Sequence, residues 1–275
     1  MNYLDHFVNY LKSEEKSDNT INSYLRDLKQ FVSYLGKDMK ELNQEDIDQY
    51  KNVLKEEGLK IKTINRKMVS VKQFIEFLNT ECDQSIIVRI KQEKQQRQEY
   101  LEDMLDKHDF KKLVDAAVTN NDTRAKAIFY TLYYTGARVS EMLQIKAEDY
   151  KKEYIWVKGK GNKHRQLFIS SKVRTAWLDY MKDRYDNSEF LFTGQRGRIN
   201  RQTIHGVIKK YADLAGVDEG KAHAHNFRHF FCKSAIDKGL TIDTVADLAG
   251  HSDINTTRIY TRKTKPELMA AINEL

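Results

Sequence analysis

Apolar residues recur three or four positions apart along most of this chain, a spacing that places them on one face of an α-helix. Residues 21–35 show the pattern clearly, since they follow the cap-forming run 17–20 and stop at Gly36. The chain's single proline, Pro266, leaves the whole periodic part free of helix breakers. The sequence therefore predicts a helix-rich protein.

The period changes in one place. Residues 154–157 and 166–169 are β-prone runs joined by the turn-forming segment 159–162. Elsewhere the spacing predicts further helices: one starting at Thr63, one starting at Ser140, and others over 109–118, 123–134, 172–181, 202–215, 226–238, 241–249 and 255–260. The expected fold class is mainly α, with a small antiparallel β-sheet in its second half.

A chain of 275 residues is long enough for two ordinary cores. Residues 85–100 are polar with weak periodicity, which favours a linker between a helical domain at 1–84 and a second, mostly helical domain at 101–262. The segment 263–275 is expected to form a short C-terminal helix, with apolar residues on one face. So short a helix must dock to persist, either on its own domain or on a neighbouring copy, and the spacing does not choose between them.

The net charge of +7 is unevenly distributed. Residues 1–100 carry 17 basic and 17 acidic residues, whereas residues 101–275 carry 30 against 23. Two stretches, residues 58–75 and 154–178, contain no aspartate or glutamate. They supply the candidate DNA-binding residues Lys60, Lys62, Arg66, Lys67, Lys72, Lys160 and Arg165. Basic patches attract polyanions through counterion release. On charge alone, a solvated charged face is the better interpretation.

Several other classes of protein find no support in the residues. No apolar run approaches the ~20 residues of a membrane helix, and the N-terminus has no signal-peptide core. Cys82 and Cys232 have no framework spacing, so reduced thiols in a cytoplasmic, nucleoid-associated protein are expected. The sequence at 159–161 lacks the ending of a phosphate-binding loop, and no cofactor is expected.

A histidine-rich segment raises the question of zinc. His223, His225, His229 and Cys232 have suitable helical spacing for metal ligands. No carboxylate accompanies them, and Arg228 places a permanent cation among the would-be ligands. The metal interpretation is therefore the weaker one, and no metal is expected.

Four short motifs follow one another in the second half. They are TGARVSE at 135–141, KGKGNK at 158–163, HNFRH at 225–229, and LAGHSD at 248–253 leading to TTRIY at 256–260. In this order the motifs resemble the tyrosine recombinase (phage integrase) family, most closely its Xer-like and transposon-encoded members. The resemblance covers nearly the whole chain, because the helices of the first 100 residues are also similar to the family's SAM-like core-binding domain.

The chemistry of phosphodiester cleavage explains the grouping. Attack at phosphorus builds negative charge on the non-bridging oxygens, and Arg138 and Arg228 are suited to clamp them bidentately. Tyr260 is the candidate nucleophile, because a phosphotyrosine conserves the bond energy and lets the strand rejoin without ATP. A phenol with a pKa of ~10 is a poor nucleophile at neutral pH, so it needs these cations and a nearby base.

The resemblance assigns the remaining catalytic roles. It implies that His225 handles the tyrosine proton, that Lys163 at the hairpin tip is the general acid for the 5′-oxygen, and that His251 hydrogen-bonds the scissile phosphate. It also implies supporting roles for Glu141, orienting the first arginine, and for His229, orienting His225. The last two assignments have ordinary alternatives as a surface acid and a helix histidine.

The resemblance further implies a C-shaped clamp of two domains around double-stranded DNA. Strand exchange would join two DNA sites and need several protomers, a tetramer in the synapse, with a second recombinase or a DNA-bending accessory protein as further candidate partners. Two alternatives stay open. A type IB topoisomerase-like enzyme would reseal the original strand, and a non-catalytic DNA-binding regulator would keep the clamp without cutting.

Overall fold

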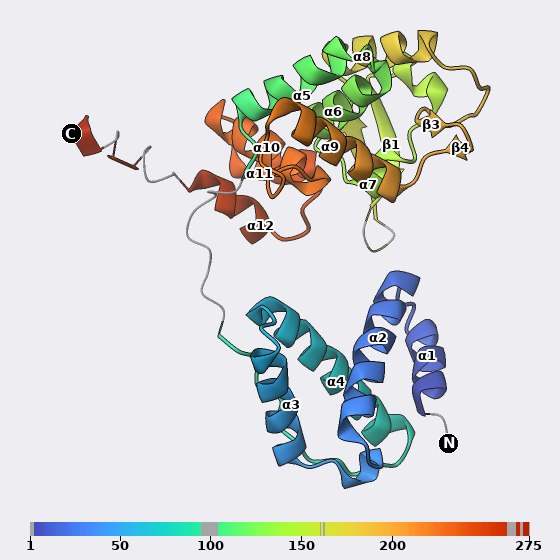
Figure 1. Ribbon diagram of the computed structural model, residues 1–275, viewed down its shortest axis with the longest axis vertical. Coiled ribbons are helices and arrows are strands. Elements are labelled where there is room, and N and C mark those ends of the chain that lie inside the picture. Colours follow the sequence, from blue (N-terminus) through green and yellow to red (C-terminus); the bar gives the residue numbers. More distant parts are fainter. Residues whose placement is uncertain are drawn as a thin grey trace. The chain divides into compact units, whose positions relative to one another are not determined.

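The structure, a computed structural model, describes residues 3–94, 104–159, 161, 163–262, 268–269 and 272–274. It separates into two compact units, Met1–Arg97 and Gln98–Leu275 (Figure 1). The division falls inside the 85–100 segment that the sequence marks as a linker. Each unit is mostly helical, so the predicted fold class is confirmed.

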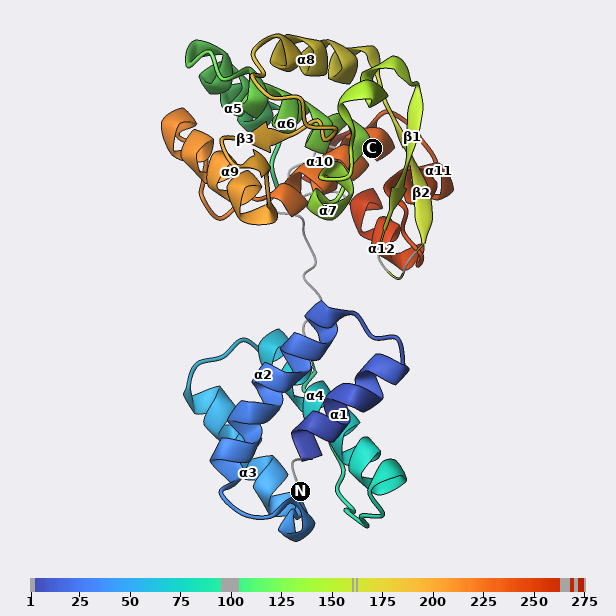
Figure 2. The same ribbon diagram turned by 90° about the vertical axis from the view of Figure 1, so that its right-hand side faces the viewer.

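The N-terminal unit consists of four helices (Figure 2). They are α1 (Tyr3–Ser13), α2 (Asp18–Leu35), α3 (Gln44–Glu56) and α4 (Ile61–Glu81), with a 3-10 turn at Met39–Glu41 between α2 and α3. Their apolar faces meet in one core, in which Phe7, Phe31 and Phe74 are fully buried. Burying each such side chain contributes roughly 1.5–3 kcal/mol, and this packing holds the short helices together.

Side-chain caps define where these helices begin. The Ser17 side chain accepts a hydrogen bond from the Thr20 amide at the start of α2, and Gly36 ends that helix in a left-handed conformation, with φ 62°. Asn43 and Asp46 form a capping box at the start of α3. Each cap satisfies backbone groups that the helix itself leaves unpaired.

Residues 84–94 form neither helix nor strand, and they are hydrogen-bonded to the helices of the N-terminal unit. The Asn79 side chain exchanges two hydrogen bonds with the Ile86 backbone, and Asn65 does the same with Glu93. Gln44 forms a third such pair with Arg89. The first part of the expected linker, residues 85–94, is therefore attached to this unit, and 95–100 lie outside the described residues.

The second unit packs helices around a large apolar core that includes Phe129, Trp177 and Phe227. Buried Trp177 donates from Nε1 to Thr131 Oγ1 at 2.7 Å, so its polar edge is satisfied. The helices are α5 (Lys107–Thr119), α6 (Thr123–Thr135), α7 (Val139–Met142), α8 (Ser171–Lys182), α9 (Arg201–Ala215), α10 (Ala224–Asp237), α11 (Ile242–Ala249) and α12 (Asn255–Arg258). The 3-10 turns Ala147–Lys151 and Ile259–Thr261 also belong to the described part of this unit.

The predicted hairpin is present, with shifted ends. β1 (Tyr154–Lys158) pairs antiparallel with β2 (His164–Phe168), and the register sets Val157 opposite Arg165. A second pair of two-residue strands, β3 (Thr193–Gly194) and β4 (Gly197–Arg198), has no signal in the residue pattern, because runs this short show no periodicity. The helix expected over 255–260 is α-helical only to Arg258 and ends in the 3-10 turn.

Candidate active site

The six candidate catalytic residues come from five separate places in the second unit. Arg138 directly precedes α7, Lys163 precedes β2, and His251 follows α11. His225 and Arg228 lie on α10, and Tyr260 lies in the final 3-10 turn. β2 and α12 both pack against α11, which brings the hairpin and the tyrosine segment to the same side of the unit (Figure 2).

Arg138 is positioned by the break after α6. Gly136 adopts φ 57°, and a Cβ there would collide with the Phe231 ring, so only glycine fits this close approach. Arg138 then donates from Nη1 to Glu141 Oε1 at 2.8 Å and from its backbone N to Oε2 at 2.7 Å. Its Nη2 reaches the Gly250 carbonyl at 3.3 Å. The guanidinium stays 29% exposed and so remains available to a ligand.

Arg228 approaches the same point from α10. Its guanidinium is 1% exposed and donates to the Gly136 carbonyl at 2.7 Å and to the Ala249 carbonyl. Because Arg138 and Arg228 bond the adjacent carbonyls of Gly250 and Ala249, the two cations lie side by side. Burial, followed by the positive charges of Arg138 and Arg165, lowers the pKa of Arg228 to about 10. The group still carries its charge at neutral pH.

Glu141 is the one carboxylate among these cations, and it is fully buried. Burial by itself raises its pKa, but hydrogen bonds and charge from Arg165, and bonds from Arg138, outweigh this effect and hold the pKa below its usual range. The carboxylate is therefore ionised and offsets part of the positive charge. Its contact with Arg138 matches the orienting role that the resemblance implies.

Two histidines are held in neutral form beside the arginines. Burial, followed by the charges of Arg228 and Arg138, lowers the pKa of His251 to about 4, and its Nδ1 shares a hydrogen bond with Thr257 Oγ1 at 2.7 Å. Burial, followed by His225, likewise lowers the pKa of His229 to about 4. A neutral imidazole presents one donor and one acceptor nitrogen.

Tyr260 is buried, at 1% exposure. Its hydroxyl shares a hydrogen bond with His229 Nδ1 at 2.5 Å and packs beside the Cys232 thiol. Burial raises the pKa of Tyr260 far above its usual value, and Cys232 adds to this effect. The residue pattern does not predict the hydrogen bond between Tyr260 and His229, because the resemblance implies that His229 orients His225. The His225 and His229 rings do meet edge to face, with centroids 4.3 Å apart.

Lys163 stands at the open side of the site. It is exposed, and its carbonyl accepts from the Gly159 amide at 2.7 Å to close the turn. Lys163, Arg138 and His251 line one surface hollow, together with Arg165 and Gly250. A phosphate in this hollow would meet an exposed ammonium, a guanidinium and an imidazole.

The DNA-binding candidates divide into exposed and internal residues. Lys60, Lys62 and Lys72 are exposed, and Lys160 lies outside the described residues. Lys67 and Arg165 require correction, because the structure places both in the interior. Their side chains are only 10% exposed, and each is paired with a buried carboxylate.

The first of those carboxylates is Asp27, which is 1% exposed. Lys67 lies 3.5 Å from Asp27 and also donates to Gln30. Arg66 donates to Asp27 and to Ser23, but its side chain stays 40% exposed. Arg66 thus remains a candidate for DNA contact, whereas Lys67 serves the interior of the unit.

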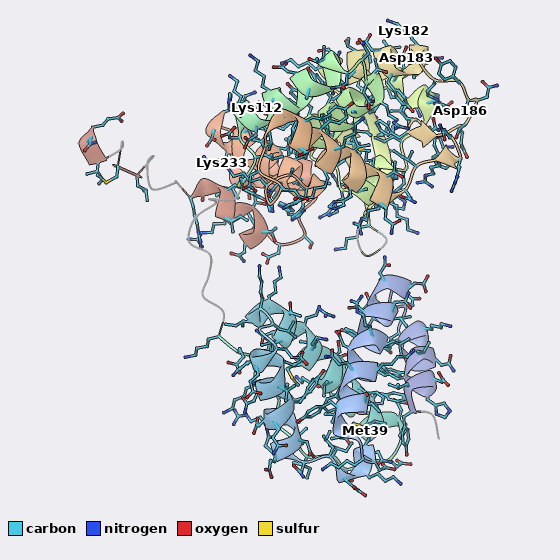
Figure 3. The ribbon with its side chains drawn as sticks, in the orientation of Figure 1. Met39, Lys112, Lys182, Asp183, Asp186 and Lys233 are labelled. Carbon is cyan, nitrogen blue, oxygen red and sulfur yellow. The ribbon has the colours of Figure 1, made fainter. Side chains whose placement is uncertain are left out.

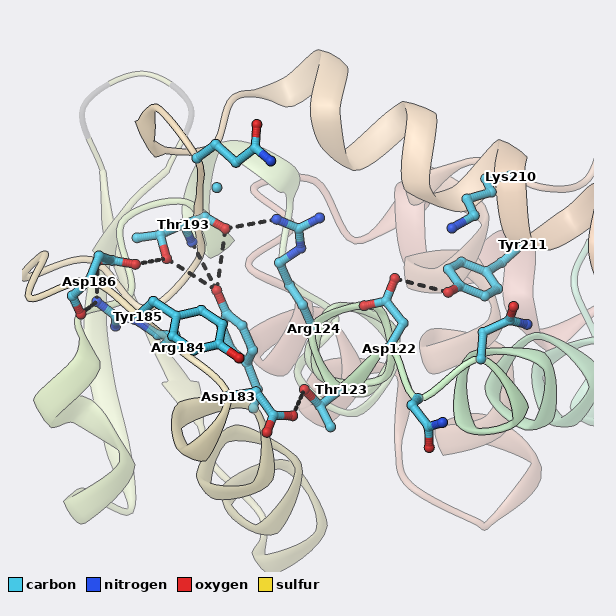
Figure 4. Close-up of a pocket in the computed structure, with 15 residues that line it drawn as sticks. Asp122, Thr123, Arg124, Asp183, Arg184, Tyr185, Asp186, Thr193, Lys210 and Tyr211 are labelled. Carbon is cyan, nitrogen blue, oxygen red and sulfur yellow. Dashed lines mark hydrogen bonds and ion pairs between the residues drawn. The ribbon is translucent and has the colours of Figure 1, made fainter.

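Another hollow in the second unit lies at the ends of α6, α8 and α9 and contains none of the candidate catalytic residues. Asp183 and Asp186 lie near each other at the end of α8 (Figure 3). The acidic side chains that line this hollow accept hydrogen bonds from other residues of the same unit: Asp183 from Thr123, Asp186 from Thr193 and Asp122 from Tyr211 (Figure 4). The carboxylates here tie loops together.

Two further findings concern the described residues only. They contain no group of three or more histidine, cysteine or acidic side chains arranged to hold a metal ion. Among them, no helix is both long and apolar enough to cross a membrane.

Comparison with known proteins adds independent evidence. Residues 103–267 match the phage integrase family, and residues 4–81 match the phage integrase N-terminal SAM-like domain. The TnP I resolvase of Bacillus thuringiensis is 33% identical over 98% of both chains, and a tyrosine recombinase of Pseudothermotoga lettingae is 29% identical over 99% of this chain and 97% of that one.

Solved structures agree. The crystal structure of XerA recombinase is 28% identical, covers 99% of this chain and 97% of that chain, and superposes with a TM-score of 0.56. XerH recombinase, in a post-cleavage complex with a palindromic difH substrate, superposes with a TM-score of 0.78 at 23% identity, over 93% of this chain and 80% of that chain. At that identity the likeness to XerH speaks for the fold alone.

Proposed function

Because the chain belongs to the phage integrase family and is a site-specific tyrosine recombinase acting on DNA, we propose that Tyr260 is its nucleophile and Arg138 and Arg228 its phosphate clamp. The observation that carries this assignment is the meeting of both arginines at the carbonyls of Ala249 and Gly250, one residue before His251. Residues more than 100 positions apart, Arg138 and His251 among them, thereby line one surface hollow.

The first step forms one bond and breaks another. The Tyr260 oxygen attacks phosphorus, the bond to the 5′-oxygen breaks, and a 3′-phosphotyrosyl enzyme and a free 5′-hydroxyl result. Arg138 and Arg228 stabilise the charge on the non-bridging oxygens, and His251 donates a hydrogen bond to one of them. The tyrosine proton passes to His225, and Lys163 protonates the departing 5′-oxygen. The reverse reaction with another 5′-hydroxyl rejoins the strand.

The buried state of Tyr260 adds a requirement. With 1% of its surface exposed and its hydroxyl bonded to His229, the side chain has to become more exposed before it attacks a phosphate. The segment 254–261 is short and begins with Ile254, which is 48% exposed, so it is the element that has to shift when DNA binds. Cleavage is therefore coupled to assembly on DNA.

We extend the proposal to the partners. The XerH complex contains a palindromic substrate, and a palindrome has two equivalent half-sites. This chain would likewise bind double-stranded DNA as several copies, a tetramer in the synapse. The described tail residues Leu268, Met269 and Ile272 are 44–62% exposed, which supports docking of the C-terminal segment on a neighbouring copy.

The test is a covalent trap. A duplex carrying the recombination site, nicked just beyond the cleavage position, loses a short fragment on cleavage and so prevents rejoining. Wild-type protein should become attached to the 3′ end and migrate slowly on a denaturing gel, whereas Tyr260→Phe should trap none. Equal trapping by Tyr260→Phe would reject the nucleophile assignment. Exchange between two labelled sites, with supercoil relaxation as the control, separates recombination from simple resealing.

A further inference from the structure

Arg165 holds an unusual position on strand β2. It lies two residues after Lys163, and its side chain is only 10% exposed, although the hairpin projects toward solvent at its tip. A guanidinium in the interior needs acceptors for its donors. The acceptors of Arg165 come from distant parts of the chain and belong to two of the four sequence motifs.

Three bonds define this position. Arg165 donates from Nη1 to the Leu248 carbonyl at 2.7 Å, and from Nη2 to Glu141 Oε2 at 2.7 Å and to the Gly136 carbonyl at 3.3 Å. The first bond joins the hairpin to the C-terminal end of α11, just before His251. The other two join it to the segment that carries Arg138.

Gly250 packs against the Arg165 side chain and so adds to the contact between β2 and the end of α11. A Cβ on Gly250 would overlap Arg165 Cδ, so the backbone after α11 packs directly on the arginine side chain. Gly250 also has φ 64°, which favours glycine. The Arg165 side chain is therefore enclosed between β2 and the turn that presents His251.

Among the described residues of the hairpin tip, Gly161 has φ 70°, and the Gly159 amide donates to the Lys163 carbonyl. Lys163 stands one residue before β2, and both Lys163 and Arg165 line the same surface hollow. Holding Arg165 in place therefore also holds the backbone from which the Lys163 side chain extends.

We propose that Arg165 is a positioning residue for the general acid: it attaches the β1–β2 hairpin to the arginine clamp so that the Lys163 ammonium reaches the 5′-oxygen. The inference rests on the proposed role of Lys163. Arg165 acts through the backbone of the hairpin and not by donating a proton itself. Lysine at this position would keep the charge beside Glu141, but a single ammonium cannot reproduce the planar fork that spans three acceptors.

The experiment uses two nicked substrates of the same sequence. One has the natural 5′-oxygen at the scissile phosphate and the other has sulfur there. Attack by Tyr260 breaks the P–O bond of the first and the P–S bond of the second. A thiol has a pKa of ~8.5, so the thiolate leaves without protonation, whereas the 5′-oxygen needs a proton. Sulfur therefore removes the need for a general acid while the arginine clamp is still required.

Arg165→Lys is the main variant, because it preserves a cation beside buried Glu141. Its single-turnover cleavage of the oxygen substrate should fall roughly 100-fold, the size of a typical general-acid contribution. Cleavage of the sulfur substrate should stay within about threefold of wild type, since the acid is then dispensable.

Two reference variants make the outcomes distinct. Arg124→Lys changes another partly buried arginine, which donates to the Thr193 carbonyl at the second hollow (Figure 4), and should cleave both substrates like wild type. Lys163→Ala should be rescued by sulfur. If Lys163→Ala is not rescued, the general-acid assignment itself fails.

If Lys163→Ala is rescued but Arg165→Lys loses cleavage equally on both substrates, or loses none on oxygen, the role of Arg165 is rejected. Thermal unfolding of each variant identifies a merely structural loss, which would lower activity on both substrates together.

Discussion

Each unit of this protein buries one carboxylate between two basic side chains, and the two sites differ in what they connect. In the N-terminal unit, Asp27 pairs with Arg66, which is 40% exposed, and with Lys67, which is 10% exposed. In the catalytic unit, Glu141 pairs with Arg138, which is 29% exposed, and with Arg165, which is 10% exposed. In both sites a buried acid holds one cation inside and orients another toward the surface.

The connections separate the two sites. The Asp27 site joins α2 to α4, two helices that already share an apolar core. The Glu141 site joins the start of α7 to β2, and through Arg165 and Arg138 it also reaches the end of α11. We therefore infer that Asp27 serves stability and surface charge, whereas Glu141 serves the geometry of the reaction.

The largest effect is expected from Glu141→Gln. Removing the acid leaves Arg138, Arg165 and Arg228 close together without a counter-charge, and breaking a buried pair typically costs about 3–5 kcal/mol. Cleavage should also fall roughly 100-fold, because Arg138 loses the group that orients it. Urea unfolding and single-turnover cleavage measure the two effects. If Glu141→Gln unfolds like wild type and cleaves at the wild-type rate, Glu141 does not orient Arg138, and the inferred difference between the Glu141 and Asp27 sites is rejected.

The contribution of Glu141 should depend on pH in a defined direction. Its folded-state pKa lies below the ordinary value of 4.5, so its stabilising effect is fully present above pH 4.5. As the pH falls through the lower folded-state value, the carboxylate is protonated and the effect is lost. The difference in unfolding free energy between wild type and Glu141→Gln should therefore be constant from pH 7 to 5 and shrink below that. A difference that grows on acidification would contradict the assigned charge state.

Asp27→Asn should have a smaller and separable effect. Loss of a charged hydrogen-bond acceptor costs about 2 kcal/mol, which should appear in the unfolding of the N-terminal unit. If Arg66 contacts a phosphate, the slope of log affinity against log salt should fall by about 0.9 when Arg66 is no longer oriented. Cleavage by the bound complex should be unchanged. A loss of cleavage comparable to that of Glu141→Gln would show that the two sites do not differ as inferred.

The residue pattern predicts most of this architecture and misses its interior polar contacts. Capping residues and periodicity place α2, α4 and the β1–β2 hairpin, because those signals are local. Lys67 and Arg165 are misplaced on a DNA-facing surface, since a basic residue in an acid-free stretch gives no sign of a carboxylate partner 24 to 40 positions away. The partner is brought close only by folding. The bond from His229 to Tyr260 escapes prediction for the same reason.

The two cysteines extend the comparison to the state of the nucleophile. Cys82, at the end of α4, is partly exposed, and burial followed by the neighbouring acids Glu81 and Asp83 raises its pKa. Cys232 on α10 is fully buried beside Tyr260, and burial raises its pKa to about 11. The thiolate is the reactive form, so both should react slowly with an alkylating reagent and Cys232 more slowly.

Departure of Tyr260 to a phosphate would uncover the Cys232 thiol, because the tyrosine ring is one of the groups that enclose it. We expect the alkylation rate of Cys232 to rise about tenfold in the trapped covalent complex, in line with greater exposure, while that of Cys82 stays within a factor of about two. Mass spectrometry of the digested protein measures each site separately, and Tyr260→Phe bound to the same DNA provides the uncleaved reference. If Cys232 stays as unreactive in the covalent complex as in the free chain, Tyr260 reaches the phosphate without leaving its neighbours, and the active site rather than the tyrosine segment must move.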